Sequence, residues 1–362
     1  TTAASTQCSD PVCKLCREDK RGCSFRTLYG DGSFFDGYVV KDRVRLGSLA
    51  ANVTFGVATS LAPPPEVPID GLIGFAYEEM ACMPTCTKPL LDGLLKRGSI
   101  SRDMFSICLD RNDGGVLTLG GIDQTVVSNQ LTVHWVQMND TTPKTFYTVP
   151  LIKRGVRFGK ETLELPSDVR YGIVDSGTTL LLMPEIVFKQ IQRSVSSNRT
   201  LCSGRAAVKG LCGSSSWFQA FACVYGLTRD DIERLPTLEF DLGKKNDREW
   251  TMEIPASTYM LPVSTFAMNG TFVRPRDEIK PDADGTVGYC VGLFPMFNEA
   301  WAGIGVIFGD TIMANKYITI YDRENHRMGF ADMGGNSCAT QNAKGAQSRR
   351  VSTRWHLVVV GV

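Results

Sequence analysis

The chain has 362 residues, of which 43% are hydrophobic, and it carries 39 basic and 38 acidic side chains for a formal net charge of +1. This length exceeds the size at which a single hydrophobic core usually keeps growing, so it predicts two lobes. The balanced charge gives no electrostatic case for nucleic-acid binding. The 35 glycines and 17 prolines fit many short strands joined by tight turns.

Twelve cysteines indicate folding in an oxidising compartment. Four of them come early, at Cys8, Cys13, Cys16 and Cys23, and Cys13-x-x-Cys16 has the spacing of zinc ligands. The sequence has only three histidines and no second C-x-x-C, so a disulfide-stapled loop is the favoured interpretation. No metal site and no cofactor are predicted.

Four segments have clear periodicity. Residues 38–46 and 131–136 carry β-branched residues in partial alternation, which predicts strands. Residues 89–95 and 184–191 begin with proline and repeat apolar residues at helical spacing, which predicts short helices. The segment MNDTTP at 138–143 breaks the strand pattern and places a boundary between the two lobes near residues 137–150.

The stretch IVDSGTT at residues 173–179 carries the strongest catalytic signal in the chain. Asp175 lies between apolar residues and a Ser-Gly turn, which predicts a buried loop between strands. Hydroxyl and backbone N–H groups can keep such a carboxylate ionised while a second acid keeps its proton. Activation of water in this way needs two carboxylates. The motif D-[ST]-G occurs once, at Asp175, so the sequence predicts only one acid of the pair.

A serine or cysteine hydrolase is the competing class of enzyme. His134, His326 and His356 lie in strand or turn contexts, and the sequence contains no G-x-S-x-G nucleophile elbow. The sequence therefore favours acid chemistry around Asp175.

Several motifs resemble those of a known family and follow its order. They are YGDGS at 29–33 followed by Gly37, DGLIGFAY at 70–77, GGVLTLGGID at 114–123, IFGD at 307–310, YDR at 321–323 and MGFA at 328–331. Together with Asp175, they resemble the bilobal, pepsin-like aspartic proteases from Tyr29 to Phe330.

The resemblance implies an all-β, bilobal fold with short helices, and an aspartic endopeptidase that acts as a monomer on an extended peptide. The implied site residues are Asp175 as a catalytic acid, Ser176, Gly177 and Thr178 as its supports, and Tyr29, Gly30 and Asp31 as the flap over the substrate. The implied organisation is an incomplete N-terminal lobe with the flap and a Cys-rich insertion at 1–140, a C-terminal lobe at 141–338, and a tail at 339–362.

One feature departs from the family. In the family, the first D-T-G motif lies several tens of residues before the flap tyrosine, whereas only 28 residues precede Tyr29 here. Asp10 is followed by proline and not by a hydroxyl residue and glycine, so it is not accepted as the missing acid. We expect a truncated N-terminal lobe whose first acid lies upstream of Thr1, so that this chain by itself is inactive. The alternative is a pseudo-protease that binds peptides or proteins without hydrolysing them.

The resemblance also bears on the cysteines. The Cys-rich insertion is similar to that of nepenthesin-type members, and Cys223 with Cys290 is similar to the family's C-lobe bridge. Cys82 and Cys86 are close enough in sequence to staple a loop. The sequence does not pair the remaining four, which are Cys108, Cys202, Cys212 and Cys338.

The chain also carries signals of the secretory pathway. N-x-[ST] motifs give weak support for a secreted glycoprotein, and they occur at Asn52, Asn139, Asn198 and Asn269. The apolar run LVVVGV at 357–362 is shorter than the roughly 18 residues of a spanning helix. It is interpreted either as a simple tail or as the start of a membrane anchor.

Overall fold

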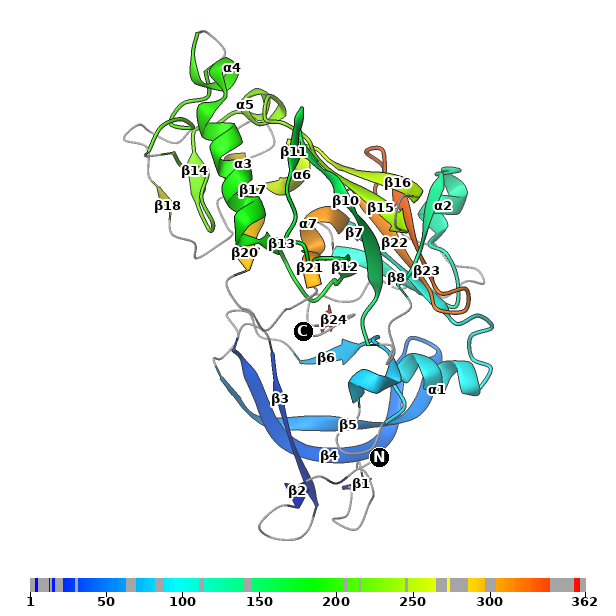
Figure 1. Ribbon diagram of the computed structural model, residues 1–362. Helices are drawn as coiled ribbons and strands as arrows, with labels where there is room; N and C mark the ends of the chain where they lie inside the picture. Colours follow the sequence, from blue (N-terminus) through cyan, green and yellow to red (C-terminus); the bar gives the residue numbers. More distant parts are fainter. Residues whose placement is uncertain are drawn as a thin grey trace.

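The computed structural model describes residues 4–5, 13, 15–16, 22–29, 32–62, 70–81, 87–110, 114–139, 145–204, 207–214, 216–244, 247–264, 272–273, 286–296, 304–314, 316–338 and 355–358. Strands dominate this part of the chain, and the helices between them are short, which confirms the all-β expectation. Figure 1 shows a lower part that is built from the first strands and a larger upper part that holds most of the remaining elements.

The lower part is built on a long antiparallel hairpin. Strand β4 (Phe34–Leu46) pairs with β5 (Leu49–Ala62) along its whole length, and β3 (Cys23–Leu28) pairs with the first part of β4. Two short strands, β1 (Ala4–Ser5) and β2 (Leu15–Cys16), complete this sheet.

A second sheet combines strands from both ends of the chain. Its order is β8-β7-β22-β23-β9, so that β22 lies between β7 and β23. The bounds are β7 (Met104–Asp110), β8 (Gly114–Leu119), β9 (Val133–Gln137), β22 (Tyr317–Asp322) and β23 (Arg327–Asp332). Every residue of β22 is buried, as expected for the central strand of a sheet that is covered on both faces.

The upper part contains an eight-stranded sheet of order β16-β15-β10-β12-β21-β13-β20, with β11 paired to β10. Its strands are β10 (Thr148–Phe158), β11 (Glu161–Leu163), β12 (Tyr171–Val174), β13 (Leu181–Pro184), β15 (Leu238–Lys244), β16 (Asp247–Ile254), β20 (Leu293–Met296) and β21 (Ile304–Phe308).

Two smaller sheets accompany these. One has the order β17-β19-β14-β18, and the other pairs β6 with β24. The bounds are β14 (Cys223–Tyr225), β17 (Met260–Ser264), β18 (Phe272–Val273), β19 (Thr286–Val291), β6 (Gly71–Gly74) and β24 (Trp355–Val358). Figure 1 places β6 and β24 between the lower and upper parts.

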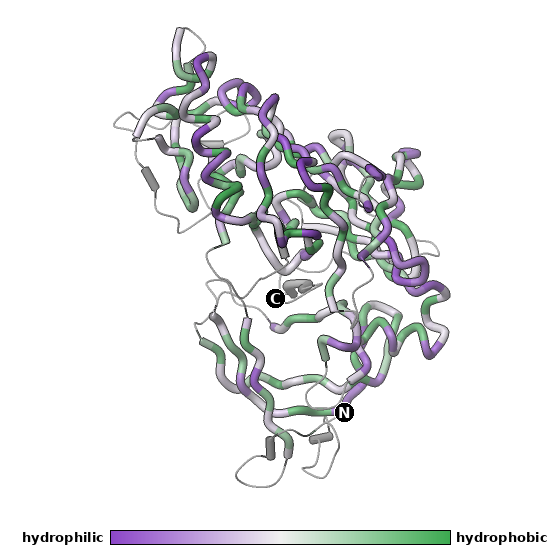
Figure 2. Tube along the Cα trace, viewed as in Figure 1, coloured by the Kyte–Doolittle hydropathy of each residue, from purple (hydrophilic) through white to green (hydrophobic). Residues whose placement is uncertain are grey.

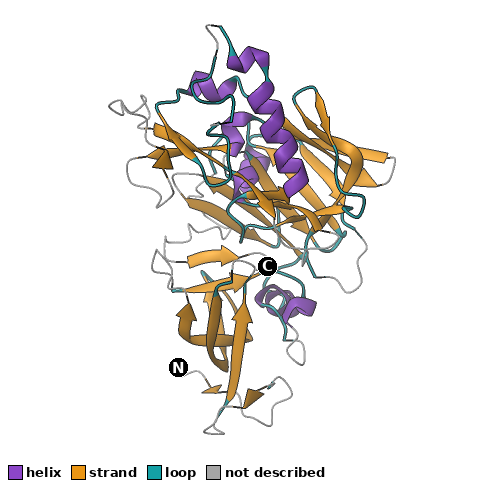
Figure 3. Cartoon of the chain, turned by 60° about the vertical axis from the view of Figure 1, so that its left-hand side comes forward, coloured by secondary structure: helices purple, strands orange, loops and turns teal. Residues whose placement is uncertain are grey.

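Most helices belong to the upper part, as Figure 3 shows. The longest, α3 (Glu185–Ser197), buries Val187, Phe188, Ile191 and Val195, which share one helical face. The other helices are η1 (Glu78–Ala81), α1 (Leu90–Lys96), α2 (Gln124–Ser128), α4 (Arg199–Cys202), α5 (Arg229–Glu233), α6 (Ala256–Tyr259) and α7 (Asp310–Met313). Figure 2 shows hydrophilic residues along the outer loops and hydrophobic residues on the inner strands.

The four periodic segments fold as predicted. The strand expected at 38–46 lies within β4, and the strand expected at 131–136 is β9, which begins two residues later. Helix α1 and helix α3 each begin directly after the expected proline, which serves as the N-cap residue. Between the expected lobes, β9 ends at Gln137 and β10 begins at Thr148.

An aromatic cluster connects the loop after β6 to the second sheet. Phe105 stacks on Tyr321 with ring centroids 4.3 Å apart, and Tyr147 meets Tyr321 edge to face at 4.8 Å. The Tyr147 hydroxyl donates to the carbonyl of Phe75 at 2.6 Å. All four side chains are buried, so this cluster couples β6 to β7 and β22 through packing as well as through a hydrogen bond.

Disulfides join four pairs of cysteines among the described residues: Cys13–Cys23, Cys108–Cys338, Cys202–Cys212 and Cys223–Cys290. Since Cys13 bonds to Cys23, it is not available as a zinc ligand beside Cys16. Cys223 and Cys290 form the bridge that the resemblance implies. Cys82 and Cys86 lie outside the described residues.

Candidate active site

The catalytic-looking Asp175 follows directly after a buried strand. Ile173 and Val174 in β12 are both fully buried, and β12 runs parallel to β21, with Val174 opposite Phe308. The backbone N–H of Asp175 donates to the carbonyl of Phe308 at 3.0 Å. The first residue of the D-S-G loop is therefore held by the neighbouring strand.

Both carboxylate oxygens of Asp175 accept hydrogen bonds within its own loop. The backbone N–H of Gly177 donates to Oδ1 at 2.8 Å, and the hydroxyl of Thr178 donates to Oδ2 at 2.7 Å. The Asp175 residue is only 1% exposed. Donors aimed at both oxygens favour the ionised carboxylate and hold it in one orientation. The structure thus brings together Asp175, Gly177 and Thr178, with Ser176 between them in the same turn.

A second carboxylate, Asp310, lies beside this loop. It begins helix α7, and its backbone N–H donates to the carbonyl of Thr178 at 2.7 Å. Its Oδ1 is buried and has no hydrogen-bond partner among the described residues. Burial, with the charge of Asp175 as the second cause, raises the pKa of Asp310 to about 8. A carboxyl group that is neutral over the acidic range therefore lies next to the loop whose donors orient the Asp175 carboxylate.

The sequence motif around Asp310 predicts only closing strands and gives this residue no role in the site. The available signal was the Gly-Asp pair that follows the apolar residues Ile307 and Phe308. In the structure, β21 ends at Phe308 beside the D-S-G loop, which brings Asp310 to the same place.

Gly309 allows the two loops to approach each other. A Cβ atom at this position would lie 2.2 Å from the carbonyl oxygen of Thr178 and 2.4 Å from that of Leu180. Both contacts are with backbone atoms, which cannot move aside by a side-chain rotation. Glycine is therefore required by close approach.

The expected flap is the turn between β3 and β4. The backbone N–H of Tyr29 donates to the carbonyl of Ser33 at 2.9 Å, and the Tyr29 ring meets Phe35 edge to face at 5.5 Å. In the body of the hairpin, a Cβ at Gly37 would lie 1.9 Å from the Val57 carbonyl oxygen. Gly30 and Asp31 lie outside the described residues.

The β6–β24 pair resembles the β12–β21 pair in strand direction and in sequence. Both are parallel, and the Leu72-Ile73-Gly74 element of β6 matches the Ile307-Phe308-Gly309 element that holds Asp175. In the β6–β24 register, Val358 lies opposite Gly74. The β12–β21 pairing ends at Val174 opposite Phe308, and continuing its register by one residue would bring Asp175 to the place opposite Gly309. A valine thus occupies the position that corresponds to the catalytic-looking acid.

No cluster of three or more histidine, cysteine, aspartate or glutamate side chains that could hold a metal ion is found in the described part of the chain. The Asp175 carboxylate is oriented by one backbone N–H donor and one hydroxyl donor.

The comparisons with known proteins identify the family. The family model for eukaryotic aspartyl proteases matches residues 16–333, and the chain belongs to this pepsin-like family. Pepsin II-2/3 of Oryctolagus cuniculus is 27% identical over 344 residues, which cover 90% of this chain and 73% of that protein. Cathepsin D of Mus musculus is 27% identical over 329 residues, which cover 86% of this chain and 67% of that protein.

A solved structure supports the fold. The crystal structure of aspartic proteinase from Irpex lacteus superimposes with a TM-score of 0.63 at 20% sequence identity, over 88% of this chain and 83% of that chain. The bilobal, pepsin-like fold that the motifs implied is therefore confirmed.

Proposed function

We propose that this chain is part of an aspartic endopeptidase in which Asp175 is one of two catalytic carboxylates and the other is provided by a segment upstream of Thr1. The observation that carries this proposal is the buried Asp175 carboxylate with a donor on each oxygen. The hydrogen bonds from Gly177 and Thr178 hold it ready to act without reorganisation.

The chemistry follows from two acids that share one proton. Like charges in close proximity cannot both ionise easily, so the pair holds a mixed state over an acidic window. The ionised member takes a proton from a bound water as that water attacks the peptide carbonyl, and the protonated member donates to the developing oxyanion. Water is the nucleophile, so no acyl-enzyme forms.

In this proposal the β3–β4 turn covers the substrate. Tyr29, Gly30 and Asp31 would close over an extended peptide, and Gly177 would let its backbone approach the catalytic acid. Asp310 is a positioning residue, because its backbone N–H donates to the carbonyl of Thr178 and so holds the D-S-G loop in place.

A pseudo-protease is the second candidate, and a specific observation favours it. Val358 of β24 lies opposite Gly74 of β6, and Asp175 would lie opposite Gly309 if the register of β12 with β21 continued by one residue. A chain that kept β24 in this place would have one D-S-G loop and could bind a peptide without hydrolysing it. In such a pseudo-protease, the β3–β4 turn and the D-S-G loop would bind the peptide without cleaving it.

The test compares this chain with a longer one that includes the upstream segment. We expect the longer chain to cleave a denatured protein at acid pH, with inhibition by a statine-type peptide and complete loss in Asp175→Asn. Asp168→Asn is the matched control, because it removes an exposed carboxylate from the same lobe. Cleavage that survives Asp175→Asn would refute the role of this acid. Binding of the statine peptide without any cleavage by the longer chain would favour the pseudo-protease.

We also propose that the protein is a monomeric, secretory-pathway glycoprotein organised as residues 1–140, 141–338 and 339–362. Four disulfides support an oxidising compartment. In the described part of the chain, no helix is both long enough and apolar enough to cross a membrane. Mass measurement of the exported protein under native conditions tests the oligomeric state and the compartment together.

A further inference from the structure

Two of the four N-x-[ST] motifs have both their asparagine and their hydroxyl residue in the described part of the chain. They are Asn52 with Thr54, and Asn198 with Thr200. Asn52 lies within β5, in register with Arg43 of β4. Asn198 lies at the junction between α3 and α4, where the chain turns. We infer that Asn198 is an N-glycosylation site; this inference rests on the proposed secretory-pathway compartment and is independent of the proposed peptidase activity.

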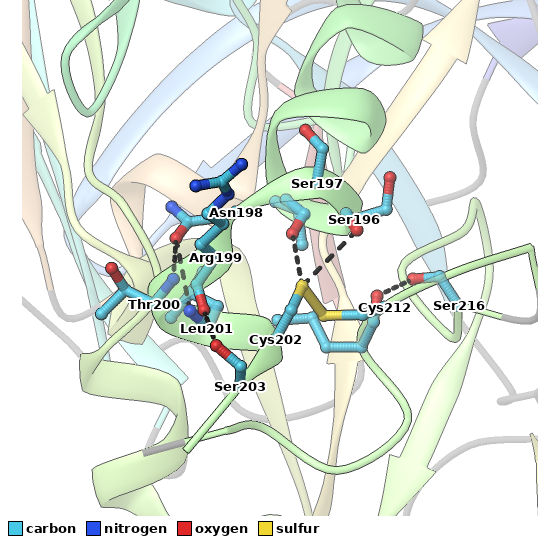
Figure 4. Close-up of a disulfide and its surroundings, with 12 residues drawn as sticks. Ser196, Ser197, Asn198, Arg199, Thr200, Leu201, Cys202, Ser203, Cys212 and Ser216 are labelled. Carbon is cyan, nitrogen blue, oxygen red and sulfur yellow. Dashed lines mark hydrogen bonds between the residues drawn. A yellow bond between two sulfur atoms is a disulfide. The ribbon is translucent and has the colours of Figure 1, made fainter. Parts of the chain in front are cut away.

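The side chain of Asn198 is oriented for modification. Its Oδ1 accepts hydrogen bonds from the backbone N–H groups of Thr200 at 3.0 Å and Leu201 at 3.3 Å. Its Nδ2 donates to no partner within the described ranges, so the nitrogen that would carry a sugar is not needed to hold the turn. Figure 4 shows the Asn198 oxygen directed toward Thr200 and Leu201. A glycan on Nδ2 therefore leaves both of these hydrogen bonds intact.

The surroundings leave room for a bulky polar group. Arg199 and Thr200 are exposed, and so are Ser197 and Ser203 on either side. A glycan at Asn198 would thus extend into solvent without displacing the core, since the buried residue of α4 is Leu201.

The site is also remote from the catalytic loop. Helix α3 begins directly after β13, close to the D-S-G loop, and Asn198 follows its other end. The helix has 13 residues, so it separates the two places by about 20 Å. Figure 1 shows α4 at the outer tip of the upper part. Modification at Asn198 would therefore lie away from the D-S-G loop.

A nearby disulfide supports the compartment that such a reaction needs. Cys202, four residues beyond Asn198, is bonded to Cys212, and disulfides form in the oxidising lumen in which N-glycans are added. The donor is a lipid-linked diphospho-oligosaccharide. A bond forms between Nδ2 and the anomeric sugar carbon, the bond from that carbon to the diphosphate breaks, and the displaced amide proton is taken up by the transferase base.

The experiment uses the full chain exported from a eukaryotic host behind a secretion signal. Peptides of the exported protein are analysed by mass spectrometry before and after treatment with a peptide N-glycosidase, which converts a glycosylated asparagine to aspartate. We expect conversion at Asn198. Exported protein in which Asn198 is unmodified would overturn the inference, whatever happens at the other motifs.

Two variants separate the glycan from the turn. Asn198→Asp keeps a side-chain oxygen acceptor for the turn but removes the amide, and Thr200→Ala keeps the backbone N–H but removes the hydroxyl that the motif requires. Both should lose one glycan in mass while keeping the unfolding temperature of enzymatically deglycosylated wild-type protein. Thr200→Ser should keep the glycan. Unchanged glycan mass in both Asn198→Asp and Thr200→Ala would also overturn the inference.

Discussion

The backbone N–H of Asp310 donates to the carbonyl of Thr178 at 2.7 Å, which joins the start of α7 to the loop that carries Asp175. The next residue repeats this contact, since the N–H of Thr311 donates to the carbonyl of Thr179 at 3.0 Å. The D-S-G loop is therefore held on one side by its own hydroxyl and N–H donors and on the other by the chain after β21. Changes at either loop should affect Asp175.

The first prediction concerns Gly309. Gly309→Ala would place a Cβ within 2.4 Å of two backbone carbonyl oxygens of the D-S-G loop, so the loop must move. We expect a loss of about 1–3 kcal/mol in the free energy of unfolding, as for other overpacking substitutions, together with loss of peptidase activity in the longer chain. Denaturant unfolding measures the first effect.

The matched control is Gly121→Ala, whose Cβ would meet no atom closer than 4.0 Å. We expect that variant to stay within about 0.5 kcal/mol of the wild type. Equal stability of the two variants would show that the contact between Gly309 and Thr178 does not constrain the loop.

The second prediction is a pH dependence of stability that comes from Asp310. The pKa of this group is about 8 in the folded protein, against about 3.9 in the unfolded chain. Between these values the folded state keeps a proton that the unfolded state has released. The stabilisation is therefore complete below about pH 4 and is lost as the pH rises toward 8.

Asp310→Asn should remove this pH dependence of stability, because the amide stays neutral at every pH. We expect the unfolding temperature of the wild type to fall more steeply between pH 5 and 8 than that of the variant, with the difference largest at the alkaline end. Scanning calorimetry across the window gives both curves. Asp168→Asn, which removes an exposed carboxylate, should give the same change of unfolding temperature with pH as the wild type. Parallel curves for wild type and Asp310→Asn would contradict the assignment.

The third prediction separates the two groups of Thr178. Its hydroxyl donates to Asp175 Oδ2, whereas its backbone carbonyl accepts from Asp310. Thr178→Val keeps the shape and the backbone contact but removes the hydroxyl. A hydrogen bond to a charged group contributes about 1.5–3 kcal/mol, so we expect kcat/KM of the longer chain to fall roughly 10- to 100-fold. Thr178→Ser should recover most of the activity, and equal kinetics for Val and Ser would rule out the hydroxyl as a support.

The sequence predicted the hydrogen bonds around Asp175 that are local in the chain. Asp175, Gly177 and Thr178 lie within four residues, so the motif alone indicates their hydrogen bonds. Asp310 was missed because its relation to Asp175 depends on the parallel pairing of β12 with β21 across more than a hundred residues, which no local pattern encodes. The pairing of Cys108 with Cys338 was undetermined for the same reason, at a sequence separation of 230. Helix α3 was found because its buried face repeats within one segment.

The last prediction concerns an ion pair that links helix α1 to the end of β22. The Arg323 side chain is 6% exposed, its Nη2 lies 3.0 Å from Asp92 Oδ1, and its Nε lies 3.4 Å from Asp103 Oδ1. Arg323→Met would leave two carboxylates in partly buried positions without their cation. We expect a loss of about 3 kcal/mol in the free energy of unfolding. This value is at the lower end of the range for breaking a buried ion pair, because both carboxylates keep some contact with water.

Arg102→Met is the control for this change. Arg102 pairs with Glu324 at 3.5 Å, but both side chains are about half exposed, at 45% and 52%. Removing an exposed pair of this kind should cost less than about 1 kcal/mol. Urea denaturation at neutral pH measures the stability of both variants. A higher salt concentration should reduce the effect of Arg102→Met by a larger fraction than the effect of Arg323→Met, because exposed charges are screened more strongly. If the two losses were equal, Arg323 would contribute no more than an exposed charge, and the ion pair would not be what holds α1 to the end of β22.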